Sequence, residues 1–266
     1  MADRKKPRAS AQSLDDRFTF QGDAVAPGNQ AALKPALHEV EDRATGALRC
    51  LKLWRKTGTL VDTDLRELWR HEMRQLQRVM AYAGAQDVIV DILEFVEDGE
   101  YFGVLLERAG QPLAAKKRRL HRHHWLQDLT AIPARTLFWK NMRRVATALG
   151  IVHRQGLVHG KLSADVVMTE GAEEPDFQLG GFEWSLWLGA DTAERSHAKV
   201  GAEGAAQRSE NYSFAQDWHA FGHMIADCLG VRIKASGEFV SPGPVKLPIA
   251  LNGSERALLK RLIFPT

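Results

Sequence analysis

Short segments of the amino-terminal part of the chain, bounded by turn residues, predict β-strands by their apolar, β-branched and aromatic content. These stretches are Arg17–Gln21, Leu37–Val40, Ala47–Trp54, Val88–Val96 and Tyr101–Glu107. The run Asp42–Gly46 has the Asp and Gly of a hairpin turn between the second and third strands. From Leu65 to Met80 apolar residues recur every three or four positions, so we expect a helix with its cap within Asp62–Asp64.

After Gly110 the pattern becomes mainly helical. Apolar positions keep a helical period from Leu137 to Val152, and Gly156 is placed to end that helix. The remaining predicted elements are a strand pair at Val166–Thr169 and Phe177–Gly180, a buried helix at Phe214–Leu229, a loop at Val231–Pro248 and a helix from a Ser254 cap to Ile263. The fold class is therefore α+β, a β-rich part with one helix followed by a mainly helical part.

The composition is that of a globular protein. The 266 residues are 44% hydrophobic and 26% charged with a net charge of +3, which excludes a collagen, a wholly disordered chain and a disulfide scaffold. The two cysteines, Cys50 and Cys228, predict reduced thiols in a cytoplasmic protein. No run approaches the ~18 apolar residues of a membrane span, so we expect no membrane partner. The basic stretch 1–17 predicts a disordered tail.

Five motifs occur in order along the chain. They are Arg49–Lys52, Glu72 within the first long helix, Gly156–Leu162, Gly181–Glu183 and Asp217–Gly222. Together they resemble the eukaryotic-type protein kinase fold over about residues 18–264. The resemblance implies two lobes, an N-lobe at 18–107 and a C-lobe at 108–266. The C-lobe lacks the last helix of the family, which predicts a fragment of a longer protein.

The positions that carry kinase chemistry hold residues of the wrong type. Lys161 stands at the catalytic Asp position, Val166 at the metal-binding Asn position and Gly181 at the metal-binding Asp position. An ammonium group accepts no proton from a substrate hydroxyl, and neither Val nor Gly offers a side-chain ligand to Mg²⁺. The phosphate-covering loop keeps only Gly22 and Gly28, badly spaced. We therefore expect no catalytic residue and no metal site.

The positions that pack the family's interior are retained. Leu76, His159, Phe182 and Asp217 match its structural spine. This selective loss resembles a pseudokinase, which implies a regulatory or scaffolding module. The Ala-, Arg- and Gly-rich composition and the shortened C-lobe suggest a multidomain bacterial signalling or defence protein as its setting. Its partner would be another protein or an attached effector domain, and its mechanism conformational. No cofactor is expected, but weak metal-independent ATP binding stays open, with candidates Lys52, Glu72, Cys50, Glu107 and Met168. Cys50 is interpreted as a packed core thiol.

Two other functions stay open. Asp165, Asp176 or Glu183 could serve as relocated acids in an atypical kinase or nucleotidyl transferase. A basic run could bind nucleic acid, although a solvated helix face is favoured. That run contains Lys116, Lys117, Arg118, Arg119 and Arg122. Its three histidines, His121, His123 and His124, are not expected to bind zinc, because no cysteine or suitably spaced fourth ligand lies near them in the sequence. Trp184 and Trp187, at helical spacing, are interpreted as packing residues.

Overall fold

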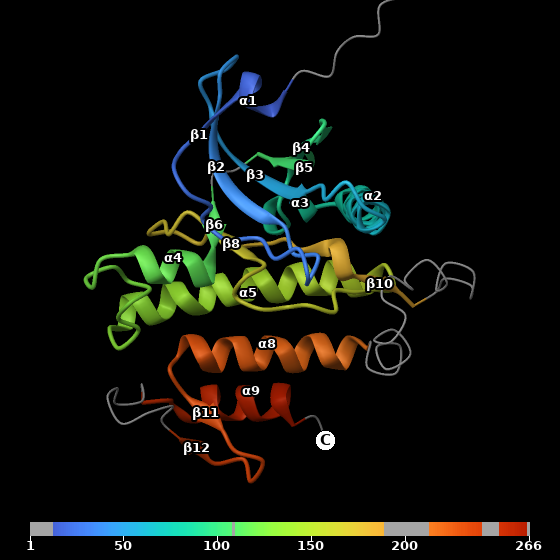
Figure 1. Cartoon of the computed structure of the whole chain (residues 1–266). Coiled ribbons are helices and arrows are strands. Elements are labelled where there is room, and N and C mark those ends of the chain that lie inside the picture. The colour runs from blue at the N-terminus through green and yellow to red at the C-terminus, as the bar shows by residue number, and fades with distance from the viewer. Residues whose placement is uncertain (1–12, 108–109, 189–212, 241–249, 265–266) are drawn as a thin grey trace, which may run out of the picture. The chain divides into compact units, whose positions relative to one another are not determined.

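The computed structural model describes residues 13–107, 110–188, 213–240 and 250–264 (Figure 1). The protein is a mixed α/β structure with an antiparallel sheet, as predicted. Its described residues form two compact units, the first from 13–66 and 92–107, the second from 67–91 and the remainder. Among the described helices, none combines the length and the apolar composition that a membrane span requires.

The first unit is built on a five-stranded sheet in the order β1-β2-β3-β5-β4, with every neighbouring pair antiparallel. Its strands are β1 (Phe18–Phe20), β2 (Ala36–Asp42), β3 (Leu48–Arg55), β4 (Ile92–Glu97) and β5 (Tyr101–Leu106). Apolar side chains from one face form the core of this unit, namely Leu14, Phe18, Val40, Leu51, Leu53, Val96 and Leu105. The opposite face of the central strands is buried as well, at Cys50, Trp54 and Phe102, so β3 and β5 are covered on both sides.

Three local predictions in this part of the chain need correction. Leu14–Arg17 forms a short helix, α1, because the Ser13 hydroxyl caps it, so the expected disordered tail does not extend to Arg17. Residues 1–12 of that expected tail lie outside the described residues. Asp62 lies inside α2 (Val61–Met80), where its carboxylate accepts hydrogen bonds from the backbone of Thr57 and Gly58 instead of capping the helix. The predicted strand Val88–Val96 starts only at Ile92, since Ala85–Val88 forms the short helix α3.

The second unit is mainly helical. Besides most of α2, it contains α4 (Leu113–Arg119), α5 (Ile132–Arg154), α8 (Phe214–Cys228) and α9 (Gly253–Ile263). Short strands complete this unit. Three of them form one sheet, β6 (Gln111–Pro112), β8 (Val167–Thr169) and β9 (Gln178–Leu179). Two pairs are separate from it: β7 (Leu157–Val158) with β10 (Leu186–Trp187), and β11 (Arg232–Ile233) with β12 (Phe239–Val240). The 3₁₀ turn Phe182–Trp184 lies between β9 and β10.

Three more sequence predictions differ from the structure in this unit. The predicted loop after α8 contains the β11–β12 hairpin, and residues 241–249 of that loop lie outside the described residues. Asn252, not Ser254, caps α9, because Asn252 and Glu255 form a reciprocal capping box. Trp187 is part of a strand and not of a helix. Gly156 does end α5 as predicted, with a φ of 74° just after the cap residue.

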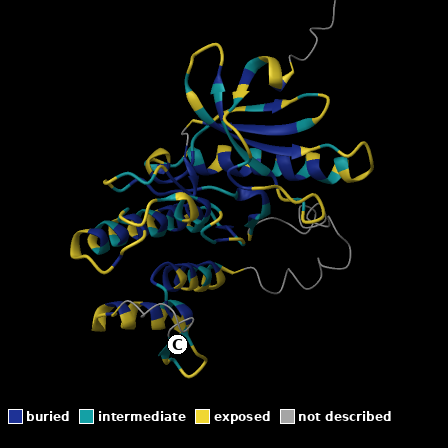
Figure 2. Ribbon diagram, turned by 60° about the vertical axis from the view of Figure 1, so that its left-hand side comes forward, coloured by how far each residue is buried: buried dark blue, intermediate teal, exposed yellow. Residues whose placement is uncertain are grey.

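Helices α8 and α9 approach each other closely at a glycine. A Cβ at Gly222 would lie 2.8 Å from side-chain atoms of both Leu262 and Ile263, so a hydrogen atom is needed there. Both helices carry buried residues on one side and exposed residues on the other (Figure 2). The contact between α8 and α9 therefore closes the apolar interior of this part of the unit and leaves a polar outer face.

Candidate functional site

The carboxylate of Asp217, in the first turn of α8, is the centre of a buried polar network. Its side chain is 1% exposed. One oxygen, Oδ2, accepts from the His159 amide at 2.8 Å and from His153 Nε2 at 2.9 Å, and Oδ1 accepts from the Gly160 amide at 2.9 Å. Burial opposes ionisation, yet the hydrogen bonds from His153 and Gly160 outweigh it and lower the pKa of Asp217. Asp217 thus holds the 159–160 backbone as an ionised acceptor.

His159 extends this network toward Phe182. Its Nε2 lies 2.8 Å from the Gly180 carbonyl oxygen, which can only accept, so the ring donates there. The His159 and Phe182 rings meet edge to face with centroids 5.1 Å apart. Three of the predicted spine residues, His159, Phe182 and Asp217, are therefore brought together, and the fourth, Leu76, is buried in α2.

Val166 and Gly181, the residues that the resemblance to kinases assigns to two metal-ligand positions, pack against each other. A Cβ at Gly181 would lie 2.5 Å from Val166 Cγ1 and 2.8 Å from Val166 Cβ. The φ of Gly181 is 76°, a conformation that L side chains rarely adopt. The Val166 side chain thus occupies the space that any side chain at 181 would need.

Lys161, which the resemblance to kinases assigns to the catalytic-base position, lies over an aromatic ring. Its Nζ is 4.8 Å from the centroid of Trp184, which supports a cation–π contact. The side chain of Lys161 is exposed. Sequence reasoning singled out both residues but not their contact, because Trp184 reaches Lys161 only through the 3₁₀ turn that follows Gly181.

The relocated acids have distinct surroundings. Asp176 is buried and accepts from the Thr169 hydroxyl at 2.8 Å and from the Glu170 and Gly171 amides at 2.8 and 3.1 Å, so it shapes the turn between β8 and β9. Asp165 is exposed, whereas Glu183 is buried in the 3₁₀ turn. Within the described ranges, no three of the His, Cys, Asp and Glu side chains gather as a metal site.

The segment Gly22–Gly28, which the resemblance compares with a phosphate-covering loop, uses two of its amides within the first unit. Val25 N and Ala26 N both donate to the carbonyl oxygen of Leu37, at 2.8 and 3.4 Å. The side chains of Val25 and Ala26 are buried. These amides therefore point into the fold and are engaged, unlike the solvent-facing amides that wrap a phosphate.

The nucleotide-binding candidates fall in both units. In the first, Lys52 is buried in β3 with its Nζ 4.8 Å from the centroid of the Trp54 ring, a contact that sequence reasoning missed. There too the Glu107 carbonyl accepts from Arg49 Nη1 at 2.7 Å. In the second, Glu72 is buried in α2 and Met168 in β8. Lys52 and Glu72 are thus both ionisable residues with buried side chains.

Cys50 is fully buried in β3, and burial, with a smaller effect of the Glu39 charge, raises the pKa of its thiol to about 12. We expect a thiol-specific disulfide reagent at pH 8 to leave Cys50 unmodified in the native protein, because only roughly one molecule in ten thousand carries the thiolate. Cys228, also buried with a raised pKa, behaves likewise. The chromophore released is the measurement. In denaturant both thiols react within minutes, and rapid native labelling of Cys50 would contradict the burial.

The basic run begins on α4 and continues beyond it. Arg118, Arg119 and Arg122 are exposed, whereas Lys117 donates to the Cys228 carbonyl at 3.3 Å. Lys116 lies against the turn between β8 and β9, since a Cβ at Gly171 would be 2.8 Å from the Lys116 Cε. The run is thus partly used to pack the second unit, and its exposed charge is that of the three arginines.

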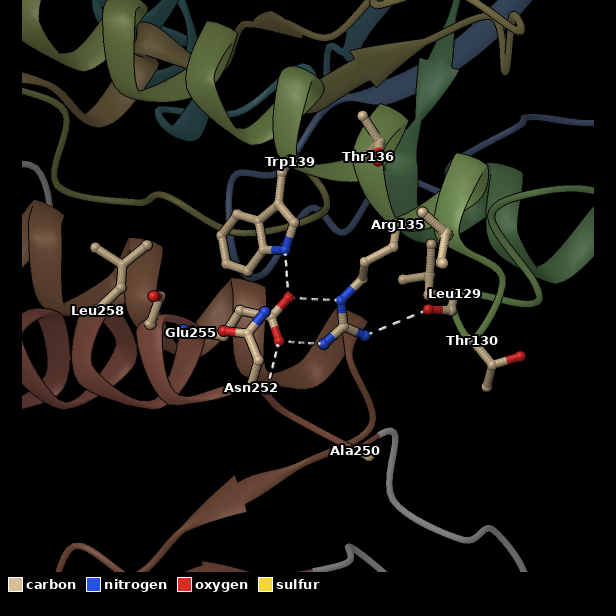
Figure 3. A pocket seen from close by; sticks show the side chains of 11 residues that line it. Leu129, Thr130, Arg135, Thr136, Trp139, Ala250, Asn252, Glu255 and Leu258 are labelled. Carbon is tan, nitrogen blue, oxygen red and sulfur yellow. Dashed lines mark hydrogen bonds and ion pairs between the residues drawn. The ribbon is translucent and has the colours of Figure 1, made fainter.

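An open pocket of about 620 Å³ lies between the start of α5 and α9, lined by Leu129, Thr130, Ile132, Arg135, Thr136, Trp139, Ala250, Asn252, Ser254, Glu255 and Leu258 (Figure 3). In it the Arg135 guanidinium binds both Glu255 oxygens, Nε at 2.7 Å and Nη2 at 2.8 Å. Trp139 Nε1 donates to the same carboxylate at 2.7 Å. The backbone N–H of Asn252 also donates to it, at 2.9 Å. The acid and the base of this pocket neutralise each other and fasten α9 to α5.

Acid weakens the protein through Glu255. Burial raises the pKa of this carboxyl, but the hydrogen bonds from Arg135, Asn252 and Trp139 are stronger together and lower it to about 2. A lowered folded-state pKa contributes stability that is present above the unfolded value near 4.5 and is lost as the pH falls toward 2, roughly 3 kcal/mol in all. Urea unfolding at pH 7 and pH 3 measures this loss. In Glu255→Gln the loss between these pH values is smaller, and an unchanged pH dependence would refute the assignment.

No protein-family model matches this chain, and no curated protein matches it either.

Proposed function

We propose that this chain is a catalytically inactive protein-kinase-like domain, a pseudokinase, that acts as a regulatory or scaffolding module. The observation that carries the proposal is the packing of Val166 against Gly181, which fills one metal-ligand position of the family with the side chain of the other. Alongside it, the Asp217 network fixes the backbone of the former catalytic loop. The packing positions of the family are retained, whereas its positions for metal binding and proton transfer are lost.

Three further features support an inactive domain. At the catalytic base position, Lys161 presents a cation. The Val25 and Ala26 amides are occupied by Leu37, which leaves them without a role in binding phosphates. Asp176, a candidate for a relocated acid, is fully engaged in its own turn. On this proposal the lobes of the family are residues 18–107 and 108–266, and the domain acts on a protein partner or an attached effector by its conformation.

The test is a thermal-unfolding titration of the chain with ATP, with and without Mg²⁺, together with a radiolabelled phosphate-transfer assay on general protein acceptors. We expect no rise in Tm that depends on Mg²⁺ and no labelled acceptor. A Mg²⁺-dependent rise in Tm, or label on an acceptor, would overturn the proposal.

The alternative, an enzyme with relocated acids, is separated by two variants. Asp165→Asn and Glu183→Gln keep the size of the side chain and remove its charge. An enzyme that used either acid would transfer phosphate in the wild type and lose that transfer in the variant while its Tm stays the same. Under our proposal, wild type and both variants show the same background signal.

A further inference from the structure

Two histidines lie one turn apart on the exposed side of α8. His219 Nε2 and His223 Nε2 are 3.3 Å apart, and the two ring centroids are 4.5 Å apart. Both side chains are exposed, and positions four residues apart share one face of a helix. The proposed function makes no use of this pair, which is remote in sequence from the positions of the kinase motifs that bind a nucleotide.

The distance between the two nitrogens is that of a chelate. Zn²⁺ binds imidazole nitrogen at about 2.0–2.1 Å with tetrahedral angles, which places two nitrogens on the same ion about 3.3 Å apart. The Nε2 atoms of His219 and His223 thus already stand at the separation of two ligands on one ion, within hydrogen-bond distance of each other. A neutral imidazole has two tautomers, so the donor ring can carry its proton on Nδ1 and present the Nε2 lone pair without releasing a proton.

We propose that His219 and His223 form a bidentate surface site for a divalent transition-metal ion such as Zn²⁺, Ni²⁺ or Cu²⁺. Imidazole ligands suit these ions, whereas Mg²⁺ and Ca²⁺ prefer oxygen. In the part of the chain that the structure describes, no third His, Cys, Asp or Glu gathers with them, so water fills the other coordination positions. The site is therefore open, and the ion keeps positions for a ligand from outside the chain.

The first experiment is calorimetric titration of the full-length, untagged chain with ZnCl₂ and, separately, NiCl₂. We expect His219→Gln and His223→Gln each to weaken the tightest binding step at least about tenfold, because a single imidazole loses the high local concentration of the second. Glutamine keeps both variants folded, since the two side chains are exposed. The matched control is His121→Gln/His123→Gln, which removes two exposed histidines from the basic run and leaves the tight step unchanged.

The second experiment counts the nitrogens directly. With one equivalent of Cu²⁺, electron paramagnetic resonance shows coupling to two imidazole nitrogens in the wild type and to one in each single variant. The proposal is overturned if His219→Gln and His223→Gln bind Zn²⁺ as tightly as the wild type, or if a single variant keeps two coupled nitrogens. It is also overturned if MgCl₂ competes with ZnCl₂ at equal concentration. None of these outcomes bears on phosphate transfer, so this site and the proposed function fail separately.

Discussion

Replacement of Asp217 by alanine is expected to lower the free energy of unfolding by roughly 4 kcal/mol or more. The substitution leaves the His159 and Gly160 amides without their acceptor in a buried place, and it removes the partner of the His153 ring. Each buried polar group without a partner costs about 1–3 kcal/mol, and loss of one member of a buried charged network costs about 3–5 kcal/mol. Equilibrium unfolding in urea measures the change.

The matched control lies on the same helix. Asp227 is an exposed carboxylate near the end of α8, and Asp227→Ala should change the stability by no more than about 0.5 kcal/mol. Asp217→Asn keeps one acceptor oxygen and is expected to fall between the two alanine variants. Should Asp217→Ala fail to express as a folded protein, the asparagine variant still measures the network. Equal urea midpoints for Asp217→Ala and Asp227→Ala would show that the hydrogen bonds give no net stability.

The long periodic elements were predictable from the sequence. Strands β2 and β3 lie at two of the expected strand segments, and α5 and α8 follow their helical period, because each of these two helices buries one face against its neighbours. The start of the predicted strand at Val88 was wrong for a physical reason. A short apolar run fits a buried helical turn as well as a strand, and Gly84, with a φ of 82°, starts the turn α3 there.

The candidate site was predictable only as a set of positions. Motif spacing pointed to His159, Phe182 and Asp217, but not to the Gly180 carbonyl or to His153, since these partners arrive from other segments. Trp187 shows the same limit. Its spacing from Trp184 suits a helix, yet the chain leaves the 3₁₀ turn and pairs with Leu157 as a strand. Such pairings depend on tertiary contacts that one sequence does not encode locally.

Val166 and Gly181 show what the structure adds to the reading of the motifs. In the sequence they are two separate departures from the kinase motifs that the chain resembles, fifteen positions apart. In the structure they are one packing unit, because the side chain of Val166 fills the space beside Gly181. A change at either position is therefore felt at the other, and this coupling can be measured.

Gly181→Ala is expected to lower the free energy of unfolding by roughly 4 kcal/mol, from about 1–3 kcal/mol of backbone strain at a φ of 76° and about 1–3 kcal/mol of overlap with Val166. The matched control is Gly150→Ala in α5, where a Cβ meets nothing within 4 Å. That control should be neutral or stabilise by up to about 1 kcal/mol, because alanine favours helix more than glycine does. Urea unfolding of both variants shows whether the loss of stability is specific to position 181 or follows from an added methyl group at any glycine.

The overlap is separated from the strain by a double-mutant cycle with Val166→Ala. This change removes the Val166 methyl atom that would lie 2.5 Å from the new Cβ, so the cost of Gly181→Ala should fall by about 1 kcal/mol in the Val166→Ala background. The strain at Gly181 stays, because it belongs to the backbone. A coupling near zero would show that Val166 moves aside freely. A measured coupling would show that Val166, and not the backbone alone, opposes a side chain at position 181.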